Sequence, residues 1–265
     1  MKNVETENLS NNRGKRSTRQ REIVLSVLRQ CDHHIDAYQI YLRAREKVSR
    51  LSLSTVYRAL APNPEVLLLD EPFSNLDADL RIRIRNEVKG ILACAGATVI
   101  FVTHDQQEAM FMGDRVGVMN RGKLEQLDTP EAIFHAPATP FVAQFIGTAD
   151  FLDGKIEDGT VATEIGKPPV YGKFSQGSDV RAMIRPDFLD IKPAHDGVGE
   201  IVDRVFQGMH YLYRVRLPSG ATVRSLQHHT KNYPAGTKVS LHVNSGHKVT
   251  CFSKSYEMTN EERLV

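Results

Sequence analysis

The sequence predicts a multidomain chain of mixed class, in which a helical head precedes a partial parallel α/β sheet and an all-β end. Three observations predict this order. Apolar residues recur at helical spacing within residues 17–60, two apolar runs are each followed by a helix within 61–147, and short strand patterns separated by turn residues fill 148–265. Residues 1–16 are polar and basic, and we expect them to be a disordered tail.

Composition places the chain among ordinary globular proteins. Hydrophobic residues make up 41% and charged residues 25% of its 265 residues. No apolar run approaches the roughly 20 residues that a membrane-spanning helix needs, and the N-terminal segment has no apolar stretch typical of a secretory signal. We therefore expect any membrane association to run through a partner.

Charge and cysteine content indicate which partners and which redox compartment suit the chain. Residues 1–60 hold 12 Lys and Arg against 6 Asp and Glu, whereas the remainder holds 22 against 26. A basic head predicts that any nucleic-acid contact lies there, although a solvated basic face is the alternative. The three cysteines form no C-x-x-C pair, which favours a reducing compartment and speaks against a zinc ribbon.

The head contains three predicted helices. Ser17 and Gln20 have the spacing of a capping box, a second helix begins near Ala37, and either Ser52 or Ser54 can cap a third. Three short helices, of which the last is polar and basic on its outer face, form a helix-turn-helix pattern.

Three motifs in the head carry a family resemblance. They are RSTRQREIVL from Arg16, HHIDAYQIY from His33 and LSTVYRAL from Leu53. In this order they resemble the N-terminal winged-helix half of the ferric uptake regulator family. The resemblance implies a DNA-binding segment over residues 17–60.

In that family the third helix enters the major groove. The resemblance therefore implies that Tyr57 and Arg58 meet DNA and that Thr55 lies near the DNA backbone. The alternative is that Tyr57 packs in the small core and Arg58 is merely exposed. His33 or His34 aligns with a metal ligand of the family, but without its partner ligands a helix-entry histidine is the favoured interpretation.

The middle segment changes to strand–helix units. The predicted elements are a strand over Glu65–Asp70, a helix over 79–93, a strand over Thr98–Thr103 and a helix over Gln107–Met112. Both apolar runs read as buried parallel strands that deliver polar residues to their carboxyl ends.

Three of those polar residues have chemistry in common. Asp70 could anchor Mg²⁺ and Glu71 could activate water, because a phosphoryl-transfer site needs both functions. His104, at the end of the next strand, lies where it could sense a γ-phosphate. Taken singly, they can also be two exposed acids and a helix-capping histidine.

The full strings decide between these interpretations. LLLDEPFSNLD from Leu67, followed by VTHDQQEA from Val102, resembles the ABC-transporter ATPase family. The resemblance implies that Asp70 is the Walker B aspartate, which holds Mg²⁺ through water, and that Glu71 is the catalytic carboxylate.

By the same resemblance, Ser74 to Asp77 form the D-loop, so that Ser74 and Asp77 lie at the nucleotide, and His104 is the switch histidine. ATP and Mg²⁺ are the implied cofactors. Membrane permease subunits and a second ATPase subunit are the implied partners, at the cytoplasmic face of the cell membrane.

The sequence also departs from that family. It contains no G-x-x-x-x-G-K-[S/T] loop, no glutamine loop and no Leu-Ser-Gly-Gly-Gln signature. Without backbone amides and a lysine to hold the phosphates, the acids have no positioned substrate. We therefore expect a truncated P-loop NTPase sheet that does not hydrolyse ATP by itself and that keeps an unpaired apolar edge.

The C-terminal part reads as short helices and strands. The predicted elements are strands over Arg115–Met119 and Lys123–Gln126, helices over Thr129–His135 and Pro140–Ile146, and five later strands over Val180–Ile184, Gly199–Val205, Tyr211–Leu217, Ala221–Leu226 and Lys238–Val243. Five short strands predict one small barrel of the OB type.

Two motifs in this part extend the ABC resemblance. MIRPD from Met183 resembles the entry to a TOBE domain of importer subunits. The run from Phe141 to Phe151 resembles iron(III) importers, so iron(III) is the implied cargo.

Three functions are compatible with these observations. The first is the ATP-binding subunit of an ABC importer, and the second is a DNA-binding regulator of the ferric uptake type. The third is a non-functional gene-fusion product, because Arg58-Ala59-Leu60 fits both families and marks a join between them.

Overall fold

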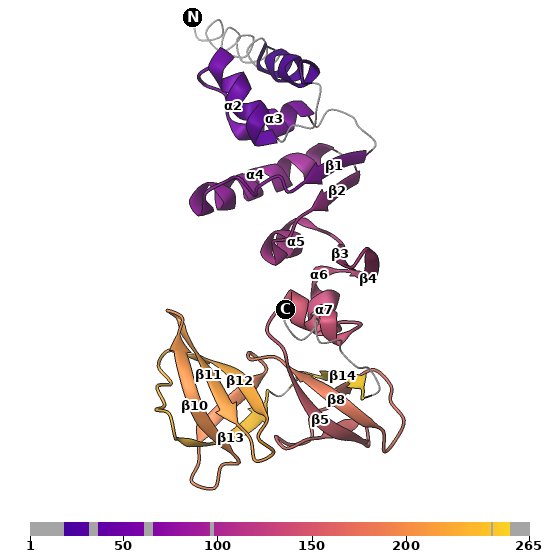
Figure 1. The fold of residues 1–265 in the computed structure, drawn as a ribbon, viewed down its shortest axis with the longest axis vertical. Coiled ribbons are helices and arrows are strands. Elements are labelled where there is room, and N and C mark those ends of the chain that lie inside the picture. Colours follow the sequence, from indigo (N-terminus) through magenta and orange to yellow (C-terminus); the bar gives the residue numbers. More distant parts are fainter. Residues whose placement is uncertain (1–18, 32–36, 61–65, 96–97, 245, 255–265) are drawn as a thin grey trace, which may run out of the picture. The chain divides into compact units, whose positions relative to one another are not determined.

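The computed structural model describes residues 19–31, 37–60, 66–95, 98–244 and 246–254 (Figure 1). The chain divides into two compact units, residues 1–114 and 115–265. The segment boundaries predicted after residues 60 and 147 both fall inside these units. The predicted tail over 1–16, the cap at Ser17 and the histidines His33 and His34 lie outside the described residues.

The first unit begins with the three predicted helices. Residues 19–29 are helical, and α2 (Ala37–Lys47) and α3 (Leu53–Leu60) follow. Ser52 caps α3, because its hydroxyl accepts a hydrogen bond from the Thr55 amide at 3.2 Å. Apolar residues at helical spacing turn inward from all three helices, among them Val24, Val27, Ile40, Ala44 and Val56.

Two strand–helix units complete the first unit. They consist of β1 (Val66–Asp70), α4 (Ala78–Ala95), β2 (Thr98–Val102) and α5 (Gln106–Met112). β1 and β2 pair in parallel with Leu68 opposite Ile100, and in the described residues they form a sheet of two strands. The predicted β-α order is therefore confirmed.

The helical head and this sheet share one hydrophobic core. Tyr57 of α3 is 1% exposed, its hydroxyl donates to the carbonyl oxygen of Pro72 at 3.0 Å, and its ring meets Phe73 edge-on. A buried phenol with a satisfied hydroxyl is a core residue. The structure therefore places Tyr57 in the core. A contact with DNA, which the family resemblance implies, would require this side chain to leave the core.

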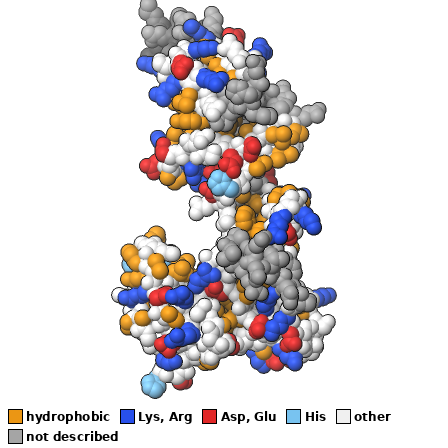
Figure 2. Space-filling model, in the orientation of Figure 1, with side chains coloured by type: hydrophobic (Ala, Val, Ile, Leu, Met, Phe, Trp, Pro, Cys, Tyr) orange, Lys and Arg blue, Asp and Glu red, His pale blue; other side chains and the backbone are white. Residues whose placement is uncertain are grey.

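The two faces of the β1–β2 sheet differ in burial. Leu69 and Phe101 turn toward the shared core, whereas Leu68 is 70% exposed on the opposite face. Val66, Ile100 and Val102 are also more than half exposed. Figure 2 shows hydrophobic side chains gathered at the surface over this part of the first unit. The prediction of two buried strands is therefore confirmed for the inner face of this sheet and wrong for the outer face.

The second unit opens with a hairpin and two short helices. They are β3 (Val116–Asn120), β4 (Lys123–Asp128), α6 (Pro130–His135) and α7 (Pro140–Ile146). Thr129 and Thr139 cap the helices, since each hydroxyl accepts an amide hydrogen bond at 3.2 Å. Within the described parts of the chain, no helix has the length and apolar content that crossing a membrane requires.

Two five-stranded sheets follow. Their strands are β5 (Asp150–Glu157), β6 (Thr160–Ala162), β7 (Val170–Tyr171), β8 (Asp179–Ile184), β9 (Leu189–Pro193), β10 (Gly199–Phe206), β11 (His210–Arg216), β12 (Thr222–His228), β13 (Lys238–Val243) and β14 (Val249–Ser253). The strand orders are β6-β5-β8-β14-β7 and β12-β11-β10-β13-β9. The single barrel of five strands was therefore too simple, although each of its five strands is present.

The two sheets pack on a common core that draws apolar residues from both, including Leu152, Ile184, Leu189, Val215 and Val249.

Arg185, which directly follows β8, is 1% exposed. Its guanidinium donates to the carbonyl oxygens of Phe134 and Thr148 and lies 4.0 Å above the Phe134 ring. Burial lowers the pKa of Arg185 to about 10. This residue ties α6 to the β-rich part.

Candidate functional site

The candidate site lies at the carboxyl ends of β1 and β2. Asp70 ends β1 opposite Val102, and the Glu71 amide donates to the Val102 carbonyl oxygen at 2.8 Å. His104 follows β2 by two residues. Because the strands are parallel and in register, the polar residues that follow them meet at one edge.

Glu71 and His104 are in direct contact. Their Oε1 and Nδ1 atoms are 2.8 Å apart, and the side chains are 44% and 75% exposed. Glu71 has φ of 42°, in the left-handed region that a non-glycine residue seldom adopts. The hydrogen bond and the negative charge of Glu71 raise the pKa of His104 above its ordinary value.

Neighbours on α4 and α5 hold the histidine segment in place. Asp105 caps α5 by accepting from the Gln107 amide at 2.8 Å, and Thr103 donates to the buried carboxylate of Glu108 at 2.9 Å. Arg81 of α4 lies 3.8 Å from Asp105 and 3.9 Å from Glu108. Sequence reasoning missed this support, although an aspartate before a helix start is a recognisable cap signal.

The two D-loop residues make local contacts. The Ser74 hydroxyl donates to the Glu71 carbonyl oxygen at 3.0 Å, and Asp77 accepts from the Leu80 amide at 2.9 Å, which caps α4. Both side chains are exposed. The structure therefore brings Ser74 beside Glu71, whereas Asp77 is engaged at the helix start.

The residues present do not by themselves fit a Mg²⁺-bound nucleotide. Asp70 is exposed, and the described residues contain no group of three or more His, Cys, Asp or Glu side chains arranged to hold a metal ion. The sequence also lacks the glycine-rich loop whose amides would cradle phosphates. In the described residues, the site is a set of acids and a histidine.

The residues implied to meet DNA are divided between core and surface. Arg58 is exposed, Thr55 is half-buried with its hydroxyl 2.8 Å from that of Ser52, and Tyr57 is buried. One basic side chain therefore remains available on the outer face of α3.

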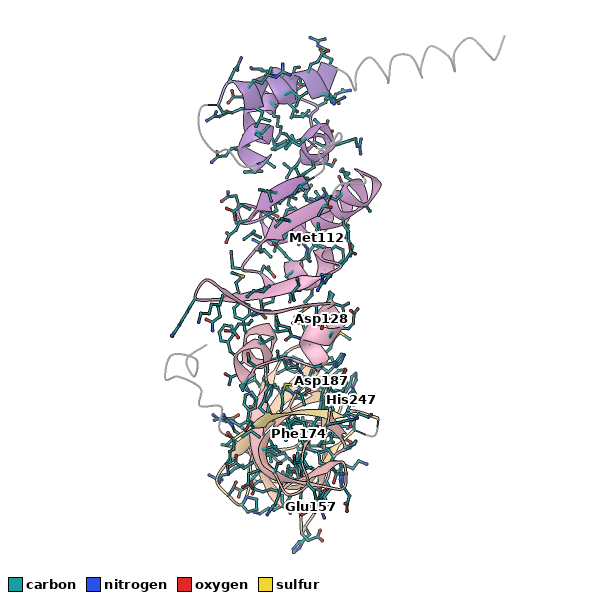
Figure 3. All side chains as sticks on the ribbon, turned by 90° about the vertical axis from the view of Figure 1, so that its right-hand side faces the viewer. Met112, Asp128, Glu157, Phe174, Asp187 and His247 are labelled. Carbon is teal, nitrogen blue, oxygen red and sulfur yellow. The ribbon has the colours of Figure 1, made fainter. Side chains whose placement is uncertain are left out.

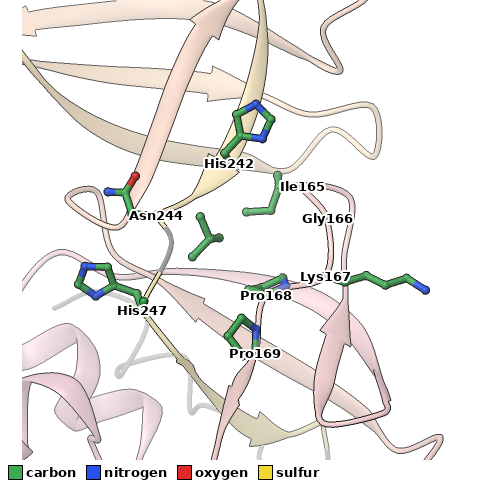
Figure 4. A pocket seen from close by; sticks show the side chains of 10 residues that line it. Ile165, Gly166, Lys167, Pro168, Pro169, His242, Asn244 and His247 are labelled. Atoms are coloured by element: carbon green, nitrogen blue, oxygen red, sulfur yellow. The ribbon is translucent and has the colours of Figure 1, made fainter.

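A hollow of about 270 Å³ lies in the second unit between the loop at Pro168 and the loop at Asn244 (Figure 4). Lys167 points out of it, as Figure 4 shows, and binds Glu157 at 2.7 Å. His247 stacks on Phe188 with ring centroids 4.3 Å apart, and Figure 3 labels it beside Asp187. Lys167 and His247 are thus engaged with neighbouring side chains.

Comparison with family models finds two matches. Residues 12–72 match the ferric uptake regulator family, and residues 182–250 match the TOBE domain. The first match crosses the predicted join and extends into β1 and the residues after it.

Comparison with known proteins finds ATP-binding importer subunits. The chain is 40% identical over 199 residues to the spermidine/putrescine import ATP-binding protein PotA 1 of Pseudomonas aeruginosa, which covers 70% of this chain and 54% of that protein. It is 34% identical over 229 residues to the Fe(3+) ions import ATP-binding protein FbpC of Fusobacterium nucleatum. This match covers 83% of this chain and 61% of that protein. The chain thus spans between half and two thirds of the length of these relatives.

The solved structures that are similar in part include a molybdate-binding protein. The cytoplasmic molybdate-binding protein ModG matches with a TM-score of 0.33 and 11% identity, covering 39% of this chain and 95% of that one.

Proposed function

Most of this chain is homologous to the ATP-binding subunits of ABC importers, and we propose that it is such a subunit in truncated form, unable to hydrolyse ATP by itself. The observation that carries the proposal is the contact between Glu71 and His104 at 2.8 Å. It joins, at one edge of the sheet, the two residues to which the family resemblance assigns the catalytic carboxylate and the switch histidine.

The absence of a phosphate-binding loop from the sequence explains why ATP hydrolysis is not expected. A carboxylate speeds phosphoryl transfer only when the phosphate and the attacking water are held in line. In this chain no phosphate-binding loop precedes β1, and Asp70 is open to solvent. ATP and Mg²⁺ are therefore cofactors of the complete subunit, and their binding here would require a second ATPase subunit.

Release of phosphate from ATP tests the proposal. The intact chain at millimolar Mg²⁺ is compared with Glu71→Gln, which keeps the size of the side chain and removes its charge. We expect both to give the rate of buffer alone. A rate above that background which Glu71→Gln abolishes would overturn the proposal.

For the cargo and the membrane partner we propose iron(III) and the permease subunits of an iron(III) importer. The resemblance of Phe141 to Phe151 supports this cargo, while the similar proteins include both iron and polyamine importers. The β-rich unit, whose residues 182–250 match the TOBE domain, would then be the OB-like accessory domain of such a subunit. Co-purification of the chain with the permease of an iron(III) importer, and not with a polyamine permease, is the expected result.

The match to the ferric uptake regulator family favours a second candidate, DNA binding through residues 17–60. Arg58 is exposed on α3, and the first 60 residues are basic. Binding to duplex DNA is measured over a series of salt concentrations, with Arg58→Ala and Arg83→Ala as a matched pair from α3 and α4. Sequence-specific binding lost only with Arg58→Ala would favour the regulator over the transporter subunit.

A further inference from the structure

Histidines gather at one end of the β11–β12 hairpin, far along the chain from the site described above. His210 begins β11 and His228 ends β12, and the two are direct cross-strand partners. His229 follows immediately. His228 and His229 are exposed, and His210 is half-buried.

The position of this pair in the ladder brings its side chains close. The neighbouring pair is joined by a backbone hydrogen bond from the His229 amide to the Met209 carbonyl oxygen at 3.0 Å. Hydrogen-bonded and non-hydrogen-bonded pairs alternate in an antiparallel ladder, so His210 and His228 occupy a non-hydrogen-bonded position, where side chains approach more closely.

The rings of the three histidines lie close to one another. The His210 and His228 ring centroids are 6.2 Å apart and the planes are nearly perpendicular at 88°. The His229 ring lies against His228 with centroids 4.2 Å apart. The side-chain hydroxyl of Thr230 lies 2.9 Å from Nδ1 of His228. The Thr230 backbone amide donates to the same nitrogen at 3.4 Å, so Thr230 engages the Nδ1 side of the His228 ring.

We propose that His210 and His228 form a two-histidine chelate for a divalent first-row transition ion such as Cu²⁺, Ni²⁺ or Zn²⁺, completed by water. Each metal–nitrogen bond is about 2.0–2.1 Å long, so a small rotation of the two rings lets both reach one ion. The described residues hold no group of three or more protein ligands in coordinating geometry, which limits this site to the pair.

The donor set decides which ions bind. Imidazole nitrogen suits Cu²⁺, Ni²⁺ and Zn²⁺, whereas Mg²⁺ and Ca²⁺ require oxygen ligands that the pair does not offer. Affinity should follow the order in which Cu²⁺ exceeds both Ni²⁺ and Zn²⁺. Binding should also weaken in acid, because protonated imidazole cannot coordinate.

Competition with a chromogenic chelator measures Cu²⁺ and Zn²⁺ binding to the full chain without a histidine tag. His210→Gln and His228→Gln are compared with His195→Gln, which changes an exposed histidine outside the cluster. We expect each variant of the pair to bind at least about tenfold more weakly and His195→Gln to bind like the unaltered chain.

Spectra of bound Cu²⁺ identify the ligands independently. Electron paramagnetic resonance should show hyperfine coupling to two imidazole nitrogens in the unaltered chain and to one in His228→Gln. Equal affinity in all four proteins, or coupling to two nitrogens that persists in His228→Gln, would overturn the proposal and indicate adventitious binding only. Mg²⁺ at millimolar concentration should leave Cu²⁺ affinity unchanged.

Discussion

At the scale of single residues, the contact between Glu71 and His104 is the central feature of the candidate site. The two side chains meet although both are well exposed, because their strands are parallel neighbours in register and Asp105 caps the helix that follows. Their geometry therefore follows from the local fold.

The pKa of His104 tests this contact. Replacing Glu71 with Gln removes the charge and should lower the pKa of His104 toward its ordinary value of 6.5. Nuclear magnetic resonance titration of the His104 ring measures the change, and Glu87→Gln, at an exposed position on α4, is the matched control. An unchanged pKa in Glu71→Gln would contradict the contact.

The sign of the pH dependence follows from the direction of that shift. The folded-state pKa of His104 is raised, so the stabilisation from the pair is fully present below pH 6.5. It is lost as the pH rises through the raised pKa. Because both side chains are exposed to water, the effect on global stability should be small.

Arg185 provides a second test at this scale. Replacing it with Met keeps most of the buried volume but leaves the carbonyl oxygens of Phe134 and Thr148 without their donor. We expect a loss of about 3 kcal/mol in the free energy of unfolding of the second unit. Arg214→Met, which breaks an exposed ion pair with Asp203, should cost no more than about 1 kcal/mol in the same urea titration. Equal losses would contradict the role of Arg185 in joining α6 to the β-rich part.

At the scale of elements, the two-stranded sheet of β1 and β2 has two unlike faces. Its inner face packs on the helical head, while its outer face exposes a row of apolar side chains. Such a face promotes association, since removal of apolar surface from water is favourable.

Two adjacent leucines on β1 lie on opposite faces of the sheet, so variants at these two positions test each face separately. Leu68→Lys, at a position 70% exposed, should change the free energy of unfolding by no more than about 0.5 kcal/mol and reduce self-association. Leu69→Lys would place a charge in the shared core and should unfold the first unit. Urea titration and light scattering measure both effects. Unfolding of the first unit by both variants would contradict the exposure of the outer face of the sheet.

The sequence indicated the α/β elements well because strong apolar periodicity and cap residues mark them, as at Thr129 and Thr139. It missed β5, β6, β7, β9 and β14, whose apolar residues alternate with charged ones or lie in short runs beside turns. It could not decide the fate of Tyr57, because its partner Pro72 is brought close only by the packing of α3 on the residues after β1.

At the scale of the whole molecule, the N-terminal helices do more than precede the ATPase-like segment. Tyr57 and Phe73 stand on either side of the predicted join and belong to one core. The chain nevertheless spans little more than half of its relatives, and the phosphate-binding loop is not in its sequence. We propose that it keeps the carboxylates of the site without the part that would hold their substrate.

Equilibrium binding of a fluorescent ATP analogue to the intact chain at millimolar Mg²⁺ tests this central claim most directly. The account predicts no saturable binding, and the same small signal from Asp70→Asn as from the unaltered chain. Saturable binding at micromolar concentrations that is displaced by ATP and weakened by Asp70→Asn would contradict it.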